Sequence, residues 1–90
     1  MNLSKTEQRV LHVLAQGGHV RVQRSPGGKI LAATCYTYDG QVLADCPLNA
    51  ILGLRRKRLI LSQEGGPYRL ARAGRLAVRA QPDNRVQEAS

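Results

Sequence analysis

At 90 residues with a net charge of +8, the chain has room for one small domain, and a second domain is excluded. Three tyrosines are the only aromatic residues, so the core must consist of Leu, Val, Ile and Ala, which leaves little material for a deep aromatic pocket. No apolar run reaches the ~20 residues that cross a membrane, and no signal peptide opens the chain, so we expect a cytoplasmic protein with no membrane partner.

The first predicted element is a helix over residues 4–16. Ser4 and Glu7 have the spacing of a capping box, in which each side chain binds the backbone N–H of the other residue. Apolar residues then recur on one helical face. Gly17-Gly18 supplies the left-handed residue that ends the helix.

Three strands follow, and we expect them to form an antiparallel meander. They cover residues 20–23, 30–38 and 41–46, joined by a turn at 25–28 and a two-residue hairpin turn at Asp39-Gly40. In this register one face of the meander collects the small apolar side chains, namely Val20, Val22, Leu31, Ala33, Cys35, Val42, Ala44 and Cys46.

The two cysteines are expected to be reduced core residues. The predicted register makes Cys35 and Cys46 diagonal neighbours, roughly 7–8 Å apart, and a disulfide prefers a Cα separation below about 7 Å. No basic residue adjoins either thiol, so neither has a reason for the lowered pKa that a redox role needs. We predict neither a metal site nor a cofactor.

The second half of the chain is predicted to form a helix, a β-hairpin and a second helix. Pro47 suits the start of a helix that ends in the basic run at 55–58. Residues 59–62 and 68–70 form the two strands of a hairpin around a glycine-rich turn. A last helix runs from about residue 71 to residue 80, with its inward side formed by Ala73, Leu76, Ala77 and Ala80.

The predicted fold class is therefore α+β. Its order is an N-terminal helix, a three-stranded antiparallel meander, a helix, a wing-like β-hairpin and a C-terminal helix. Residues 1–85 form a single domain, and residues 86–90 form a disordered tail.

Positive charge is concentrated in the second half. Residues 53–80 carry eight basic side chains against Glu64 alone, which favours a polyanionic partner such as nucleic acid or an acidic protein surface. Eleven of the fourteen cations are arginine, which contacts carboxylate or phosphate in bidentate fashion. The predicted partner-binding residues are Arg55, Arg56, Lys57, Arg58, Arg69, Arg72, Arg75 and Arg79.

No catalytic constellation accompanies this charge. His12 and His19 do not share a helical face, Asp39 belongs to a turn, and the paired glycines are not followed by the Lys and Ser/Thr of a phosphate-binding loop. We therefore expect a protein that acts by binding and not by catalysis.

Two features leave alternatives open. The helix, hairpin and helix resemble the wing portion of winged-helix domains, which would make the protein a DNA-binding transcriptional regulator. Tyr36 and Tyr38 are predicted beside Arg21 on the less apolar face of the sheet. There they could stack single-stranded bases or, as is more common for such tyrosines, cover a helix or pair two copies of the chain.

Several segments along the whole chain carry a resemblance to a known family, among them Met1-Asn2-Leu3-Ser4, Cys35-Tyr36, Leu43-Ala44-Asp45-Cys46, Pro67-Tyr68-Arg69 and Arg79-Ala80-Gln81-Pro82-Asp83-Asn84-Arg85. They resemble the YjhX family, also called TopAI. The likeness covers residues 1–85 and departs in the second helix, which is richer in arginine here. It implies a toxin of a bacterial toxin–antitoxin pair that binds and inhibits DNA topoisomerase I, with an acetyltransferase-like antitoxin as its partner. It brings no catalytic residues.

Overall fold

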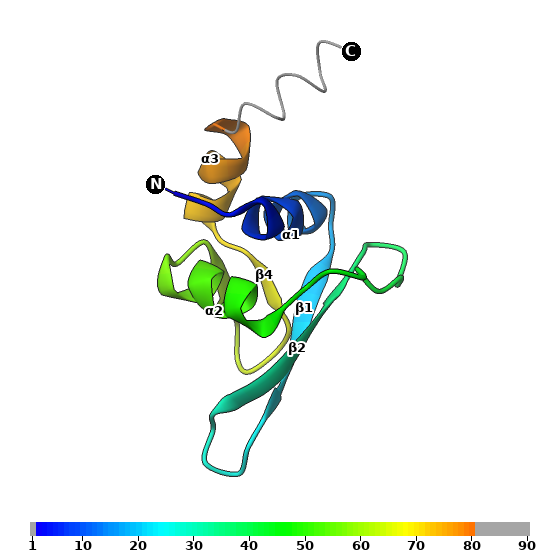
Figure 1. The fold of residues 1–90 in the computed structure, drawn as a ribbon, viewed down its shortest axis with the longest axis vertical. Helices are drawn as coiled ribbons and strands as arrows, with labels where there is room; N and C mark the ends of the chain where they lie inside the picture. Colours follow the sequence, from blue (N-terminus) through cyan, green and yellow to red (C-terminus); the bar gives the residue numbers. More distant parts are fainter. Residues whose placement is uncertain (1, 81–90) are drawn as a thin grey trace.

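A computed structural model describes residues 2–80 and confirms the α+β class, with three helices and one four-stranded antiparallel sheet in the order β2-β1-β4-β3 (Figure 1). The tail predicted at 86–90 lies outside the described residues. The elements are α1 (Lys5–Ala15), β1 (His19–Arg24), β2 (Ile30–Tyr36), α2 (Leu48–Arg56), β3 (Ile60–Ser62), β4 (Tyr68–Leu70) and α3 (Arg72–Ala80).

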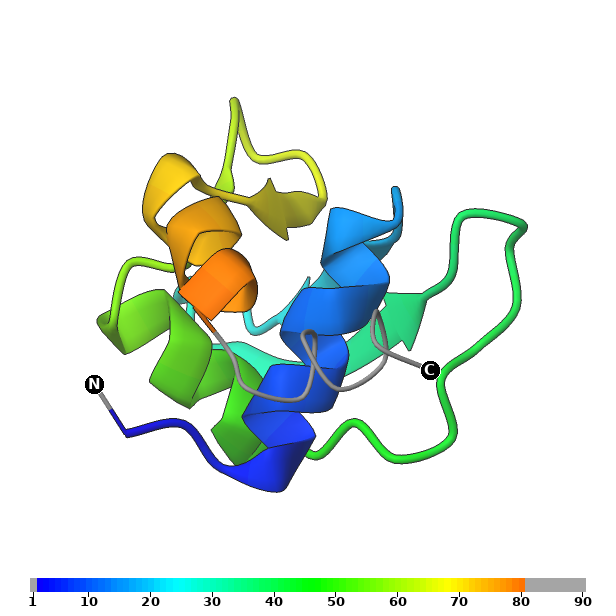
Figure 2. The same cartoon turned by 90° about the horizontal axis from the view of Figure 1, so that it is seen from above.

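Helix α1 begins where the capping box predicted. The backbone N–H of Glu7 donates to Ser4 Oγ at 3.1 Å, and the N–H of Ser4 donates to Glu7 Oε1 at 2.9 Å. The helix ends at Gly17, which has a φ of 103° that other residues rarely adopt. Helix α1 contacts α2, α3 and β4, so it lies at the centre of the helical layer (Figure 2).

The hairpin of β1 and β2 has the predicted turn but a different register. Val20 pairs with Cys35 instead of Ala33, its partner in the predicted register. Because this shift of two residues is even, the apolar side chains of the two strands stay on the core face. A bulge opposite Gln23 leaves Leu31 without a partner. The bulge turns Ile30 inward and Leu31 outward, where it is 56% exposed, so the predicted core position of Leu31 is wrong.

The third strand of the predicted meander does not form. Residues 41–46 make a single bridge to β2, between Val42 and Tyr36. The turn holds three residues instead of two, because the N–H of Thr37 donates to the Gln41 carbonyl at 2.8 Å. This one-residue slip reverses the side on which each side chain lies, and Val42 is 60% exposed instead of buried.

The second hairpin, β3 and β4, forms as predicted but is not a separate wing. It joins the first hairpin through one antiparallel pair, Val20 with Tyr68. The two hairpins thus make one sheet, and the helices bury a common core against it. The largest fully buried side chains of this core are Leu11, Ile51, Leu54, Leu59, Val10, Val20 and Cys35.

Candidate functional site

The basic run after α2 forms a helix end of the Schellman type. The N–H of Leu59 donates to the Leu54 carbonyl at 3.0 Å, and the N–H of Arg58 donates to the Arg55 carbonyl at 3.0 Å. Arg58 occupies the left-handed position, at a φ of 61°. A side chain there costs roughly 1 kcal/mol, which is why glycine usually takes this place. The buried leucines fix the turn, and Arg58 projects from it exposed.

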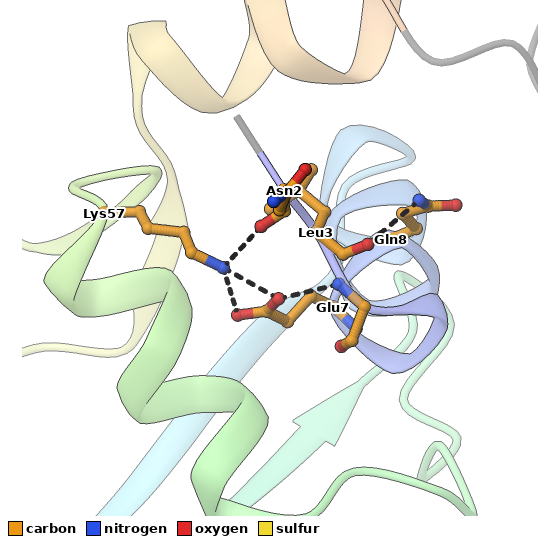
Figure 3. Close-up of polar contacts among 6 residues, drawn as sticks. Asn2, Leu3, Glu7, Gln8 and Lys57 are labelled. Carbon is orange, nitrogen blue, oxygen red and sulfur yellow. Dashed lines mark hydrogen bonds and ion pairs between the residues drawn. The ribbon is translucent and has the colours of Figure 1, made fainter.

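Lys57, within the same run, is engaged inside the fold (Figure 3). Its Nζ lies 2.9 Å from each carboxylate oxygen of Glu7 and donates to the Asn2 carbonyl at 2.9 Å. Burial raises the pKa of Glu7, but hydrogen bonds from Lys57 and Ser4 outweigh it, so the net pKa is lowered. Lys57 therefore fastens the end of α2 to the start of α1, which sets it apart from the neighbouring arginines.

Gly53 makes this ion pair possible. A Cβ atom at position 53 would overlap Glu7 Oε2. A glycine in the middle of a helix costs roughly 1 kcal/mol against alanine. Gly53 leaves room for the buried Glu7 carboxylate between α1 and α2. This space explains why a residue that disfavours helices occupies the middle of α2.

Of the remaining predicted arginines, Arg69 lies in β4, and Arg72, Arg75 and Arg79 lie in α3. The N–H of Ala71 donates to the Leu59 carbonyl at 2.9 Å, so α3 starts against the turn that ends α2. Gly74 packs on the same carbonyl, since a Cβ there would overlap it. The two segments that carry the candidate arginines therefore meet at Leu59. The candidate arginines, all exposed, are Arg55, Arg56, Arg58, Arg69, Arg72, Arg75 and Arg79.

The close packing of Gly74 also changes the face that α3 turns inward. Ala77 is half-buried as predicted. Ala73 and Leu76 are exposed, Leu76 by 57%, so their predicted inward position is wrong. The inward side of α3 is instead set by Gly74, the smallest residue, which allows the helix backbone to approach the hairpin. The side chain of Ala80 lies outside the description.

A groove of about 490 Å³ brings two candidate arginines together. It opens where β1 and β4 diverge beyond their single paired position. Arg69 and Arg75 line it, while Gly17 and Gly18 contribute no side chains. The other lining residues are Leu14, Leu61, Gln63, Pro67 and Leu70, so the groove presents polar and apolar surface in nearly equal parts.

The candidate arginines have no acidic partner among residues 2–80. The ion pairs within this part of the chain are Lys57 with Glu7 and Arg9 with Asp45. Unpaired, exposed guanidinium groups keep their capacity for bidentate bonds to carboxylate or phosphate. The chemistry that this region supports is therefore the binding of anionic groups.

Sequence reasoning missed one aromatic pair on the outer face of the sheet. His19 and Tyr36 are paired across β1 and β2, and their rings stack with centroids 5.2 Å apart. Burial, followed by the positive charges of Arg21 and Arg69, lowers the pKa of His19. The alternation of β1 already placed His19 and Arg21 on one face, but the pairing with Tyr36 depends on the bulge-shifted register.

The two cysteines are free, with Cys35 buried and Cys46 half-buried. A hydrogen bond between their thiols raises the pKa of Cys35, and burial raises it further. The same hydrogen bond lowers the pKa of Cys46. The prediction that neither thiol has a lowered pKa is therefore wrong for Cys46, and the cause is the second cysteine and not a basic residue.

None of the helices within residues 2–80 has the length and apolar character needed to cross a membrane. Within the same range, His, Cys, Asp and Glu side chains do not gather in threes around a possible metal position.

Comparison with known proteins identifies relatives along nearly the whole chain. Residues 1–85 match a family described as "Putative toxin of bacterial toxin-antitoxin pair", YjhX_toxin. A UPF0386 protein of Beijerinckia indica is 61% identical over 85 residues, covering 94% of this chain and 100% of that protein. A UPF0386 protein of Caulobacter vibrioides is 54% identical over 86 residues, covering 96% and 94%.

A third relative, a UPF0386 protein of Brucella anthropi, is 54% identical over 85 residues, covering 94% of this chain and 100% of its own length. No solved structure matches the chain. The match over residues 1–85 shows that the chain belongs to the YjhX toxin family of bacterial toxin–antitoxin pairs.

Proposed function

We propose that the protein is a toxin that binds DNA topoisomerase I and inhibits it, with the candidate arginines as its contact residues. The observation that carries this proposal is that seven exposed arginines, unpaired within residues 2–80, lie on two segments that meet at Leu59. The YjhX resemblance supplies the target. An enzyme that holds DNA presents both carboxylates and phosphates, and arginine binds either group.

The surroundings of these arginines favour a protein partner over bare DNA. Leu76 is 57% exposed on α3, one turn from Arg72 and from Arg79. An exposed leucine between cations gains nothing from a phosphate backbone, but it fills an apolar site on a protein surface. Arginine is one of the residues that dominate the binding energy of protein–protein interfaces, and neighbouring contacts such as those of an exposed leucine exclude water around it.

Arg58 supports the same assignment. It occupies a left-handed position where glycine would be less strained. Residues held in such conformations are often found at functional sites, where the strain fixes a side chain in place. The Schellman turn holds the backbone of this exposed arginine directly before Leu59, the residue on which the start of α3 packs.

Membership of a toxin–antitoxin family implies an antitoxin partner. We propose that an acetyltransferase-like antitoxin neutralises the protein by covering the candidate arginines, so that antitoxin and topoisomerase compete for one surface. An antitoxin of this kind needs an acidic docking face, because electrostatic complementarity sets both encounter rate and specificity.

Relaxation of supercoiled plasmid by purified topoisomerase I tests the proposal. We expect inhibition that weakens when Arg72, Arg75 and Arg79 are changed together to Gln. The matched control changes Lys5, Arg9 and Lys29 together to Gln, which removes the same three positive charges from exposed positions outside the candidate arginines. Full relaxation at a large molar excess of the unaltered protein refutes the proposal. A gel shift on duplex DNA across a salt series, without topoisomerase, separates inhibition from direct DNA binding, which falls steeply with salt.

A further inference from the structure

We propose that the outer face of the sheet, together with the groove beside it, binds single-stranded nucleic acid. The face is formed by His19, Arg21, Tyr36 and Arg69, which belong to three adjacent strands. This inference goes beyond the proposed function and does not depend on it, because it concerns a different ligand and is carried by the stacked His19 and Tyr36 rings, while Arg69 and Arg75 serve both proposals.

The His19 and Tyr36 rings form an aromatic platform on this face. His19 and Tyr36 are direct Cα partners across the hairpin, and their rings lie 5.2 Å apart with an interplanar angle of 19°. Because each ring supports the other, their orientation is fixed before any ligand arrives. A nearly parallel pair offers an outer ring face to a base, and base stacking on aromatic side chains is the main sequence-tolerant contact of single strands.

The charges around this platform match a phosphate backbone. Arg21 and Arg69 are exposed and close enough to lower the pKa of His19, together with burial, so the imidazole stays neutral and presents an aromatic surface. The four strands contain no acidic residue. A third cation, Arg24, is engaged by donating to the Tyr68 hydroxyl at 3.1 Å and to the Gly28 carbonyl at 3.0 Å. The cations available for phosphate are therefore those next to the aromatic pair.

The groove extends this surface past the edge of the platform. Arg69 belongs to both, and Arg75 lies on the far side of the groove. Gly17 and Gly18 leave space directly before His19 in the chain. Tyr38, which is exposed, starts its side chain next to Gly17, because a Cβ at Gly17 would lie 3.3 Å from the Tyr38 Cβ. A strand whose base stacks on Tyr36 therefore has cations for its phosphates on the neighbouring strands β1 and β4.

An unpaired strand fits these features better than a duplex. The bases of a duplex are stacked inside the helix and offer no ring to the platform, whereas the bases of a single strand are free to stack. An acidic peptide would use the arginines but not the stacked rings. The aromatic pair is thus the feature that selects the ligand.

Fluorescence anisotropy with a labelled oligothymidylate about 12 nucleotides long, a length in the range of known single-strand sites, tests the inference. We expect Tyr36→Leu to weaken binding by about 5- to 150-fold, the effect of losing one base–aromatic stack. Tyr36→Phe, which keeps the ring, should bind as the unaltered protein does. Arg69→Gln should weaken binding and reduce its salt dependence, while Arg9→Gln on α1 should change affinity by less than about two-fold. Circular dichroism shows whether each variant is folded.

Three outcomes overturn the inference. The first is equal binding of the single strand and the matching duplex. The second is an equal loss of affinity in Arg69→Gln and Arg9→Gln, which would mean that only net charge matters. The third is displacement of the oligonucleotide by oligoglutamate with no effect of Tyr36→Leu, which would assign the face to an acidic protein. If Tyr36→Leu unfolds the chain, Tyr38→Ala and Arg21→Gln take its place. Both should then weaken single-strand binding, and unchanged affinity in both rejects the inference.

Discussion

Replacing Glu7 by Gln tests the ion pair between α1 and α2. The glutamine keeps the shape of the side chain and can still accept from the Ser4 N–H, but it loses the negative charge and one of the two oxygens that lie 2.9 Å from Lys57 Nζ. The Glu7 and Lys57 side chains are 8% and 30% exposed. A charge-assisted hydrogen bond in such a site is worth about 1.5–3 kcal/mol, so we expect a loss of about 2 kcal/mol in the free energy of unfolding.

A double-mutant cycle isolates the pair. Lys57→Met removes the cation and leaves the buried carboxylate unpaired, so alone it should cost about 3 kcal/mol. The double variant should lose less than the sum of the single variants, with a coupling energy of about 1–2 kcal/mol. Urea denaturation followed by far-ultraviolet circular dichroism measures all three. Additive losses would show that the contact stabilises nothing and refute the reasoning.

Four other changes have defined outcomes. The pKa of Glu7 is lowered in the folded state, so ionised Glu7 contributes fully to the free energy of unfolding above the ordinary carboxyl pKa of about 4.3. This contribution is lost as the pH falls through the folded-state pKa. In a profile of stability against pH, Glu7→Gln should therefore flatten the acidic limb. Arg58→Gly should raise stability by about 0.5–1 kcal/mol in urea denaturation, since φ is 61° there. Gly74→Ala should lower the thermal midpoint despite its better helix propensity, at a net cost of about 1–2 kcal/mol, because the new methyl overlaps a backbone carbonyl. Iodoacetamide should modify Cys46 before Cys35, as peptide mass spectrometry would show, because only Cys46 has a lowered pKa and partial exposure.

The elements whose signals are local were predictable from the sequence. Helix α1 follows from a capping box spanning four residues and a glycine stop, and both lie where expected. The β3–β4 hairpin follows from its turn. The candidate arginines at the end of α2 and along α3 are exposed. The sequence predicts this exposure because charged side chains are rarely buried without a partner.

The rest depends on contacts between distant residues or on a single inserted residue. Lys57 looked like one more cation in a basic run, and only the approach of Glu7, fifty positions earlier, gives it a structural role. The bulge at Leu31 and the three-residue turn after Thr37 each change the register by local hydrogen bonding that alternation does not encode. The orientation of α3 depends on one glycine against one carbonyl.

The single paired position between β1 and β4 has a mechanical consequence. Six residue pairs join β1 to β2 and three join β3 to β4, whereas Val20 and Tyr68 alone join β1 to β4, so the sheet is most easily bent between the two hairpins. Each hairpin can tilt about this pair as a rigid unit without breaking its own hydrogen bonds. The width of the adjoining groove then depends on how α1, which contacts β4 and contributes Leu14 to the groove lining, packs against the sheet, and a bound molecule of different thickness can be accommodated by adjusting side-chain packing alone.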